Sequence, residues 1–194
     1  MYAYLQGKFT VKNPAQVYVD INGVGYEVNI SLNTYSHIQS LEHGRLFTYL
    51  QIKEDSHTLY GFFDKAEKEI FVQLIGVSGI GASTARMMLS SIKPEEITRA
   101  IVQGNVKLLE SIKGIGKKTA ERLVLELKDK IGKSGTDINI LATAGNSLQN
   151  DALNALIALG ISRSIAEASV KKIILSEPGI SNLEDLIKKA LKTL

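Results

Sequence analysis

The sequence predicts a multidomain α+β protein in which an N-terminal β domain precedes two helical domains. All seven Tyr and four of the five Phe residues precede residue 65 of the 194-residue chain, and aromatic residues favour strands. Beyond that point the apolar residues recur at helical spacings. A stretch rich in Gly, Ser, Thr, Ala and Asn later interrupts the helical pattern. We therefore expect a β domain, a central helical domain, a flexible linker and a C-terminal helical domain over residues 1–64, 65–131, 132–147 and 148–194.

The β domain is predicted by β-branched and aromatic residues that alternate at about period two. Five such segments are separated by turn-forming residues, and they span residues 2–12, 15–22, 26–31, 45–53 and 57–63. After the third segment, residues 32–44 predict a short helix that ends at Gly44. Five strands with one helix after the third are typical of an OB-type β-barrel. An open five-stranded sheet has the same periodicities and remains an alternative.

The central domain is predicted to contain five helices, none longer than about four turns. Ile70, Phe71 and Leu74 fall on one face of the first helix, and Pro94 opens the third helix, which stops at Gly104. The expected helices span residues 66–76, 82–92, 94–104, 106–112 and 117–131.

A repeat with an offset of 35 residues runs through this domain. Superposing residues 74–85 on residues 109–120 pairs Leu with Leu, Gly-Ile-Gly with Gly-Ile-Gly and Thr-Ala with Thr-Ala. Glycine permits a tight turn with positive φ, and the Ile between the glycines can fill the gap between two helices. The pattern predicts two helix-hairpin-helix units in tandem.

Each unit ends at the start of a helix, where free backbone N–H groups and the helix dipole can hold a phosphate. Such a contact reads the nucleic-acid backbone and not its bases. One copy is equally explained by the needs of a turn. Two copies, in a segment with twelve Lys and Arg against eight Asp and Glu, favour DNA binding. The candidate DNA-binding residues are Gly79, Gly81, Ser83, Thr84, Gly114, Gly116, Lys117, Lys118 and Arg122, with Lys113 nearby.

Other interpretations of the glycine-rich turns fail on particular residues. A P-loop needs a lysine where Ala82 stands. At the second turn it needs a glycine at Ser111 and a hydroxyl residue at Lys118. A dinucleotide-binding turn needs a third glycine at Thr84 and a preceding strand. Because of the P-loop mismatches we expect no ATPase motif. Cysteine is absent and the three histidines have no metal-ligand spacing, so we also expect no cofactor and no metal site.

Two alternatives to a non-catalytic DNA-binding protein stay open. A glycosylase or nuclease can use the same hairpins, but it needs a Lys with a placed Asp, or clustered carboxylates, beside them. Asp129, Glu121 and Glu126 form no convincing cluster of this kind. The aromatic residues of the β domain could instead stack on single-stranded bases. Residues 1–64 carry four Lys and Arg against six Asp and Glu, which disfavours this second alternative.

The C-terminal domain is predicted to be a small three-helix bundle of the UBA-like type. Its first helix ends at Gly160, its second follows Ser162, and its third opens with the capping box formed by residues 181–184. Fewer than fifty residues make a marginal core, so some apolar side chains should stay exposed and available to a partner.

Three blocks of sequence, in this order, resemble the RuvA family, the Holliday-junction-binding subunits of the bacterial branch-migration complex. They are residues 24–28 (VGYEV), 54–62 (EDSHTLYGF) and 114–123 (GIGKKTAERL). The similarity extends over the whole chain. It implies a non-catalytic protein that holds a four-way DNA junction open and square-planar. It further implies a homotetramer or an octamer, with the hairpins on the minor-groove side of each DNA arm.

The resemblance also implies partners and a location. The C-terminal domain is expected to bind the hexameric ATPase motor RuvB, and the resolvase RuvC is expected in a larger assembly. Homologous recombination, DNA repair and the SOS response to DNA damage are the implied processes, in the cytoplasm and without a membrane. In agreement, no apolar stretch approaches the ~18 residues of a membrane span.

Two further residues acquire a role through the resemblance. Glu54 and Asp55 stand at a predicted hairpin tip, and on the sequence alone they read as a solvated turn. In the family, the matching acidic tips meet at the junction centre and repel phosphates, so we expect these residues to form an acidic pin. One departure concerns the first hairpin, where Ala82 stands in place of a common basic residue and Arg86 is the nearest cation. The second hairpin should therefore supply more of the electrostatic attraction to DNA.

Overall fold

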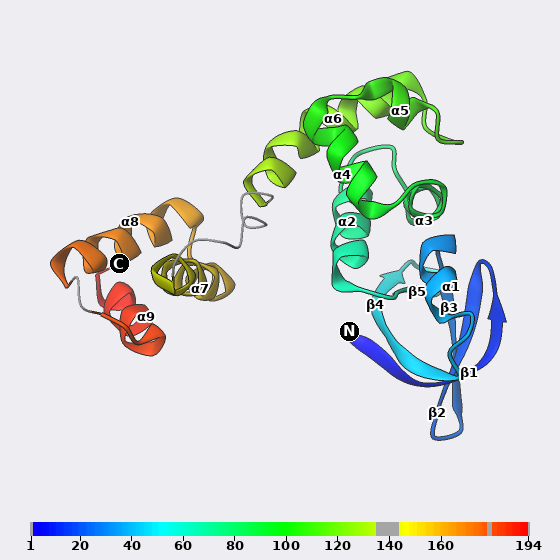
Figure 1. Ribbon diagram of the computed structural model, residues 1–194, viewed down its shortest axis with the longest axis horizontal. Helices are drawn as coiled ribbons and strands as arrows, with labels where there is room; N and C mark the ends of the chain where they lie inside the picture. Colours follow the sequence, from blue (N-terminus) through cyan, green and yellow to red (C-terminus); the bar gives the residue numbers. More distant parts are fainter. Residues whose placement is uncertain (1, 135–143, 178–179, 194) are drawn as a thin grey trace. The chain divides into compact units, whose positions relative to one another are not determined.

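The computed structural model describes residues 2–134, 144–177 and 180–193 (Figure 1). The chain divides into two compact units, Met1–Thr136 and Asp137–Leu194, and each has its own apolar core. Within the described residues, none of the helices combines the length and the apolar character that crossing a membrane requires.

The N-terminal strands form a closed barrel in the order β1-β2-β3-β5-β4. Neighbouring strands are antiparallel except β3 and β5, which are parallel. All five expected strands are confirmed, as is the barrel, and the open-sheet alternative is wrong. The strands are β1 (Tyr4–Asn13), β2 (Gln16–Ile21), β3 (Val24–Ile30), β4 (His43–Ile52) and β5 (His57–Phe62). Inward-facing side chains such as Val17, Val19 and Val28 are fully buried in the barrel core.

The helix expected over residues 32–44 is shorter than predicted. Helix α1 (Leu32–Ile38) ends before Gly44, which lies in β4 opposite Gly7 of β1. A Cβ atom on Gly44 would lie 2.9 Å from the ring of Phe9, which points into the barrel core. Packing inside the barrel therefore requires this glycine, and the prediction that it ends a helix is wrong.

Five helices follow the barrel, as expected. They are α2 (Lys65–Ile75), α3 (Ala82–Ser91), α4 (Pro94–Gln103), α5 (Val106–Glu110) and α6 (Lys117–Ser134). Proline at the first position of α4 and Gly104 in the left-handed conformation at its end mark the predicted limits of that helix. Their core is continuous with the barrel, because Tyr60 and Phe62 of β5 belong to the same buried cluster as the helical side chains.

Helix α6 is longer than expected. It has 18 residues, or about five turns, so the limit of about four turns is wrong. Leu123, Leu127 and Ile131 repeat every four residues, and all three are buried. These three residues form the buried face of the helix as far as Ile131.

The expected linker, residues 132–147, is helical at both of its ends. Helix α6 reaches Ser134 and helix α7 begins at Ala144. The glycines near the two ends, Gly132 and Gly145, do not prevent a helix. An isolated glycine destabilises a helix by only about 1 kcal/mol relative to alanine. Residues 135–143, which include the apolar Ile138, Ile140 and Leu141, lie outside the described residues.

The C-terminal unit contains the three predicted helices, α7 (Ala144–Ala158), α8 (Arg163–Ser176) and α9 (Leu183–Lys192). They pack around a core of small and branched residues, namely Ala152, Leu156, Ala166, Val170, Ile173, Leu186 and Ala190. Gly160 has a φ of 91° just after α7, as its predicted role at the end of that helix requires. Leu159 and Leu175 are 63% and 73% exposed, so the expected exposure of apolar side chains is confirmed.

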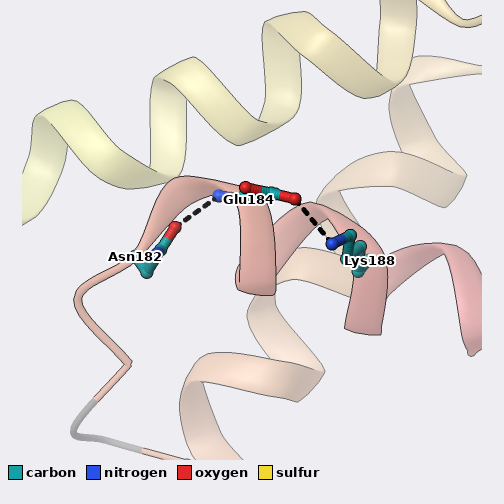
Figure 2. A network of polar contacts seen from close by, with 3 residues as sticks. All are labelled: Asn182, Glu184 and Lys188. Carbon is teal, nitrogen blue, oxygen red and sulfur yellow. Dashed lines mark hydrogen bonds and ion pairs between the residues drawn. The ribbon is translucent and has the colours of Figure 1, made fainter.

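The cap of α9 differs from the prediction by one residue (Figure 2). Asn182, and not Ser181, is the N-cap, and its side-chain oxygen accepts a 2.9 Å hydrogen bond from the backbone N–H of Glu184. The carboxylate of Glu184 points along the helix and pairs with Lys188 at 2.5 Å. The predicted capping box is therefore wrong, because Glu184 is bound one turn ahead and does not reach back to the cap.

Candidate nucleic-acid interface

The two predicted hairpins have the same backbone hydrogen bonds. The first lies between α2 and α3, and the second lies between α5 and α6. In each turn two backbone N–H groups, three residues apart, donate to the oxygen three residues back along the chain. The bonds are Val77 to Leu74 and Ile80 to Val77 in the first turn, and Ile112 to Leu109 and Ile115 to Ile112 in the second. The repeat found in the sequence is therefore a structural repeat.

The first glycine and the isoleucine of each turn are required by the fold. Gly79 and Gly114 have φ values of 95° and 90°, in the left-handed region that favours glycine. Ile80 and Ile115 are only 5% and 4% exposed, and both belong to the core between the helices. The predicted role of these isoleucines in filling the gap is confirmed.

The second glycine of each turn has no such internal reason. Gly81 has an ordinary extended backbone with a φ of −86°. A Cβ atom on Gly81 or on Gly116 would meet no other atom within 4 Å. Neither turn geometry nor packing within the chain explains these two glycines. They leave bare backbone on the surface, which a sugar-phosphate chain can approach closely.

The helices that follow the turns begin with exposed polar groups. Gly81 caps α3 without a side-chain hydrogen bond, so it satisfies none of the free N–H groups of the first turn. Ser83 is exposed and Thr84 is partly exposed at this end of α3. Lys117 and Lys118 are exposed at the matching end of α6. Both ends can hold a phosphate, and only the second adds cations within its first turn.

Arg122 connects the two hairpins. Its Nη1 donates a 3.1 Å hydrogen bond to the backbone oxygen of Ser78, which lies in the first turn. Its Nε lies 3.9 Å from a carboxylate oxygen of Glu126. Arg122 was predicted as a DNA contact, and the structure gives it a second task, which is to keep the two turns beside each other. The sequence carries no local signal for this contact between residues of two repeats.

Arg86 is directed toward the barrel. Its Nη1 donates a 2.7 Å hydrogen bond to the side-chain oxygen of Asn29 and a 3.1 Å bond to the backbone oxygen of Ala15. Arg86, the cation nearest to the first hairpin in the sequence, is thus held against the barrel by neutral oxygen atoms. It keeps its charge, but its guanidinium is already engaged within the chain.

Glu54 and Asp55 lie in the turn between β4 and β5, as predicted, and both are exposed. The turn is closed by a 2.9 Å hydrogen bond from the backbone N–H of Lys53 to the oxygen of Ser56. Within the part of the chain that the structure describes, neither carboxylate forms an ion pair. Two uncompensated negative charges therefore project at one end of the barrel.

The two alternative functions can be compared with this geometry. In the described ranges, no group of three or more His, Asp or Glu side chains is placed to hold a metal ion. Phe9 is buried in the barrel core, as expected, and Tyr60 and Phe62 are buried where the barrel meets the helices. Tyr4 is exposed, but the guanidinium of Arg45 lies over its ring at 4.5 Å from the centroid. The other exposed aromatic side chains, Tyr2 and Phe63, contact the rings of Tyr26 and His37. Each exposed aromatic ring among the described residues thus has a partner within the chain, which disfavours single-strand binding by stacking.

The charge asymmetry predicts unequal salt effects. Replacing Lys117 and Lys118 with Gln should reduce the slope of log affinity against log salt by about two per chain, since each phosphate contact contributes about 0.9. Arg86→Gln should leave the slope nearly unchanged, because Arg86 is bound to Asn29. Fluorescence anisotropy with duplex DNA over a salt series measures both slopes. Equal changes would contradict the assignment.

The glycines predict a separation of stability from binding. Gly116→Ala places its Cβ atom in open space, so the melting temperature should stay unchanged while DNA affinity falls about tenfold, or ~1.4 kcal/mol. Gly114→Ala is the matched comparison, since a φ of 90° strains alanine and should lower the melting temperature. Thermal unfolding and anisotropy measure the two effects. Unchanged DNA affinity in Gly116→Ala would refute the close approach of DNA at this turn.

Comparisons with known proteins agree with this geometry along the whole chain. Residues 1–61 match the family model described as RuvA N terminal domain, residues 71–129 match the SAM-like helix-hairpin-helix tandem, and residues 147–194 match the RuvA C-terminal domain. Proteins named Holliday junction branch migration complex subunit RuvA are similar over their full length. Those of Christiangramia forsetii and Flavobacterium psychrophilum are 49% and 50% identical over 100% of both chains. That of Cytophaga hutchinsonii is 46% identical over 99% of each chain, and from this similarity the chain belongs to the RuvA family.

Proposed function

We propose that this chain is the DNA-binding, non-catalytic subunit of a Holliday junction branch-migration complex. The observation that carries the proposal is the pair of superposable hairpins, each with a second glycine that the fold itself does not need. Membership of the RuvA family supports the same conclusion. The function is to bind a four-way junction and to present it to a motor protein.

Recognition of the backbone suits branch migration for a physical reason. The base pairs at the branch point change with every step, so a protein that read bases would stop at preferred sequences. Backbone N–H groups and lysines contact phosphates, which are the same at every step. The hairpins can therefore hold the DNA arms while the sequence at the centre changes.

The acidic tip contributes geometry and not affinity. Glu54 and Asp55 lack ion-pair partners among the described residues, so they repel any phosphate that approaches the tip. A repulsive element within a basic DNA-binding protein disfavours the binding of continuous duplex at that place. In a junction, the same repulsion keeps the exchanging strands apart, which makes this tip the acidic pin.

The remaining partners follow from symmetry and from the separate C-terminal unit. A square-planar junction has four equivalent arms, which four copies of one chain match, and a second set of four would give an octamer. The ATPase motor RuvB supplies the energy, and the exposed apolar side chains of the C-terminal unit, such as Leu159 and Leu175, support a docking role for that unit. The resolvase RuvC joins a larger assembly on the same junction. These steps belong to recombination and repair in the cytoplasm.

The proposal predicts a strong preference for branched DNA. In a competition gel shift with magnesium and a salt series, a four-way junction should be bound at least about tenfold more tightly than duplex of the same sequence, or ~1.4 kcal/mol. No cleavage product should form. Equal affinities, or cut DNA, would show that the hairpins bind DNA in a protein with another task.

The acidic pin predicts a loss of this preference. The double change Glu54→Gln and Asp55→Asn should raise duplex affinity and reduce the ratio of junction to duplex affinity several-fold, because repulsion at the tip is removed. The matched control replaces Glu95 and Glu96, two exposed carboxylates in the first turn of α4, with Gln. The control changes the net charge equally and should leave the ratio unchanged. The same ratio in both variants would contradict a role for the tip.

A further inference from the structure

A buried carboxylate joins the barrel to the first hairpin. Glu67 lies in the first turn of α2 and is 0% exposed, although neither the barrel core nor the DNA-binding turns use it. Burying a carboxylate is costly unless hydrogen bonds replace its water. A charged group in such a position calls for an explanation beyond the formation of a helix.

The partners of Glu67 are matched to a carboxylate. Ser31 and Thr34 donate their hydroxyl hydrogens to its two oxygens, and the bond from Thr34 is 2.6 Å long. Each hydroxyl oxygen is itself an acceptor, of the Thr34 backbone N–H at 2.9 Å and of the Phe63 N–H at 3.0 Å. Each hydroxyl therefore accepts a backbone N–H and donates its single hydrogen to Glu67. An ionised carboxylate can accept both of these hydrogen bonds. We call these three residues, Glu67, Ser31 and Thr34, the Glu67 clasp.

The Glu67 clasp fixes three segments that are far apart in the sequence. Ser31 and Thr34 form the start of α1, Phe63 follows β5, and Glu67 belongs to α2, the first helix of the first hairpin. The direction in which α2 leaves the barrel is thus set by directional bonds. Apolar contacts alone, which are non-directional, would permit rotation of one part against the other.

The second helix of the same hairpin has a separate attachment. Ser90 of α3 accepts a 3.1 Å hydrogen bond from the backbone N–H of Leu32, at the start of α1. One turn earlier, Arg86 binds Asn29 and Ala15 of the barrel. Both helices of the first hairpin are therefore attached to the barrel beside α1, which lies at the end of the barrel nearest α3 in Figure 1.

Stability by itself does not account for the carboxylate. Burial raises the pKa of Glu67 above its usual value near 4.5, with a smaller contribution from the charge of Asp64, and hydrogen bonding by Ser31, Thr34 and Asn33 offsets this only in part. A raised pKa means that the folded chain binds the proton more tightly than the unfolded chain. The contribution of Glu67 to stability is therefore full at pH values below 4.5 and declines as the pH rises through the raised pKa. At higher pH the ionised Glu67 lowers the free energy of unfolding relative to the protonated form. The ionised carboxylate still accepts the hydrogen bonds from Ser31 and Thr34.

We propose that Glu67 is a positioning residue for junction recognition. The Glu67 clasp sets the orientation of the first hairpin relative to the barrel, and hence relative to the acidic tip at Glu54 and Asp55. Duplex DNA needs only the hairpins, whereas a four-way junction must fit the hairpins and the tip together. Loosening the clasp should therefore reduce junction selectivity and leave duplex affinity in place. The inference rests on the proposed function.

Two substitutions loosen the Glu67 clasp without removing bulk. Glu67→Gln leaves a single acceptor oxygen, so one hydroxyl loses its partner. Thr34→Val removes one hydroxyl and keeps the branched shape. Thr34→Ser is the conservative variant, which retains the hydroxyl and should behave as the unaltered chain. Val19→Ala is the control for general destabilisation, since Val19 is fully buried in the barrel core and is not part of the clasp.

The first measurement is the ratio of junction to duplex affinity, taken below the unfolding temperature of every variant. Glu67→Gln should lower the ratio about tenfold, Thr34→Val should lower it less, and neither should change duplex affinity. Val19→Ala should lower the melting temperature and leave the ratio unchanged. An equal loss of selectivity in Val19→Ala would show general destabilisation and would overturn the proposal. If Glu67→Gln does not fold, the pair Thr34→Val and Thr34→Ser decides the same question.

The second measurement needs no DNA. The chain has no cysteine, so Ser56→Cys beside the acidic tip and Ser78→Cys, an exposed position in the first hairpin, can be spin-labelled selectively. Dilution with unlabelled chain restricts the signal to distances within one chain. The distance distribution should broaden in Glu67→Gln and not in Val19→Ala. An unchanged distribution and an unchanged affinity ratio in Glu67→Gln would overturn the proposal. A lack of junction preference in the unaltered chain would instead contradict the proposed function, while the distances would still test the clasp.

Discussion

The packing of Phe71 against the barrel is the contact on which the rest of the N-terminal unit depends. This side chain of α2 is fully buried, and its ring lies 4.8 Å from that of Phe62 and 5.1 Å from that of Tyr60 in β5. The ring of Tyr49 in β4 meets it edge-on at 5.5 Å. Because these rings belong to one core, the barrel and the hairpins form a single compact unit. The Glu67 clasp then adds direction to an attachment that apolar packing alone would leave free to turn.

The two hairpins share a backbone and differ in their attachments. The first is bonded to the barrel through Arg86 and Ser90, and it offers hydroxyls at its DNA-binding end. The second is bonded to the first through Arg122, and it offers lysines. The barrel thus fixes the orientation of the first hairpin, and the first hairpin fixes that of the second. The exposed lysines that attract phosphate thus belong to the second hairpin, whereas the bonds from Arg86 and Ser90 belong to the first.

The C-terminal unit follows a different principle. Its core is separate, and its small size leaves large apolar side chains exposed on α8 and just after α7. Exposed apolar side chains of this kind suit contact with another protein, which is the role proposed for this unit above.

The secondary-structure elements and the repeat could be predicted from local sequence patterns. Alternation at period two located the strands, and identical residues at an offset of 35 located both hairpins, because these patterns reflect local backbone conformation. The packing and hydrogen bonds between residues far apart in the sequence could not be predicted in this way. From the sequence Gly44 is predicted to end a helix, whereas in the barrel its place is decided by the ring of Phe9. The sequence shows Arg86 only as the cation nearest to the first hairpin, and its hydrogen bond to Asn29 depends on the folded barrel.

Glu67 shows the same limit most clearly. It stands three residues after the N-cap Asp64, where a glutamate reads as an ordinary solvated start of a helix. Only the closed barrel brings Ser31 and Thr34, more than thirty residues earlier in the sequence, onto its carboxylate. Local sequence sets φ, ψ and periodicity, whereas burial and hydrogen-bond partners arise from contacts that form when the barrel closes and α2 packs upon it.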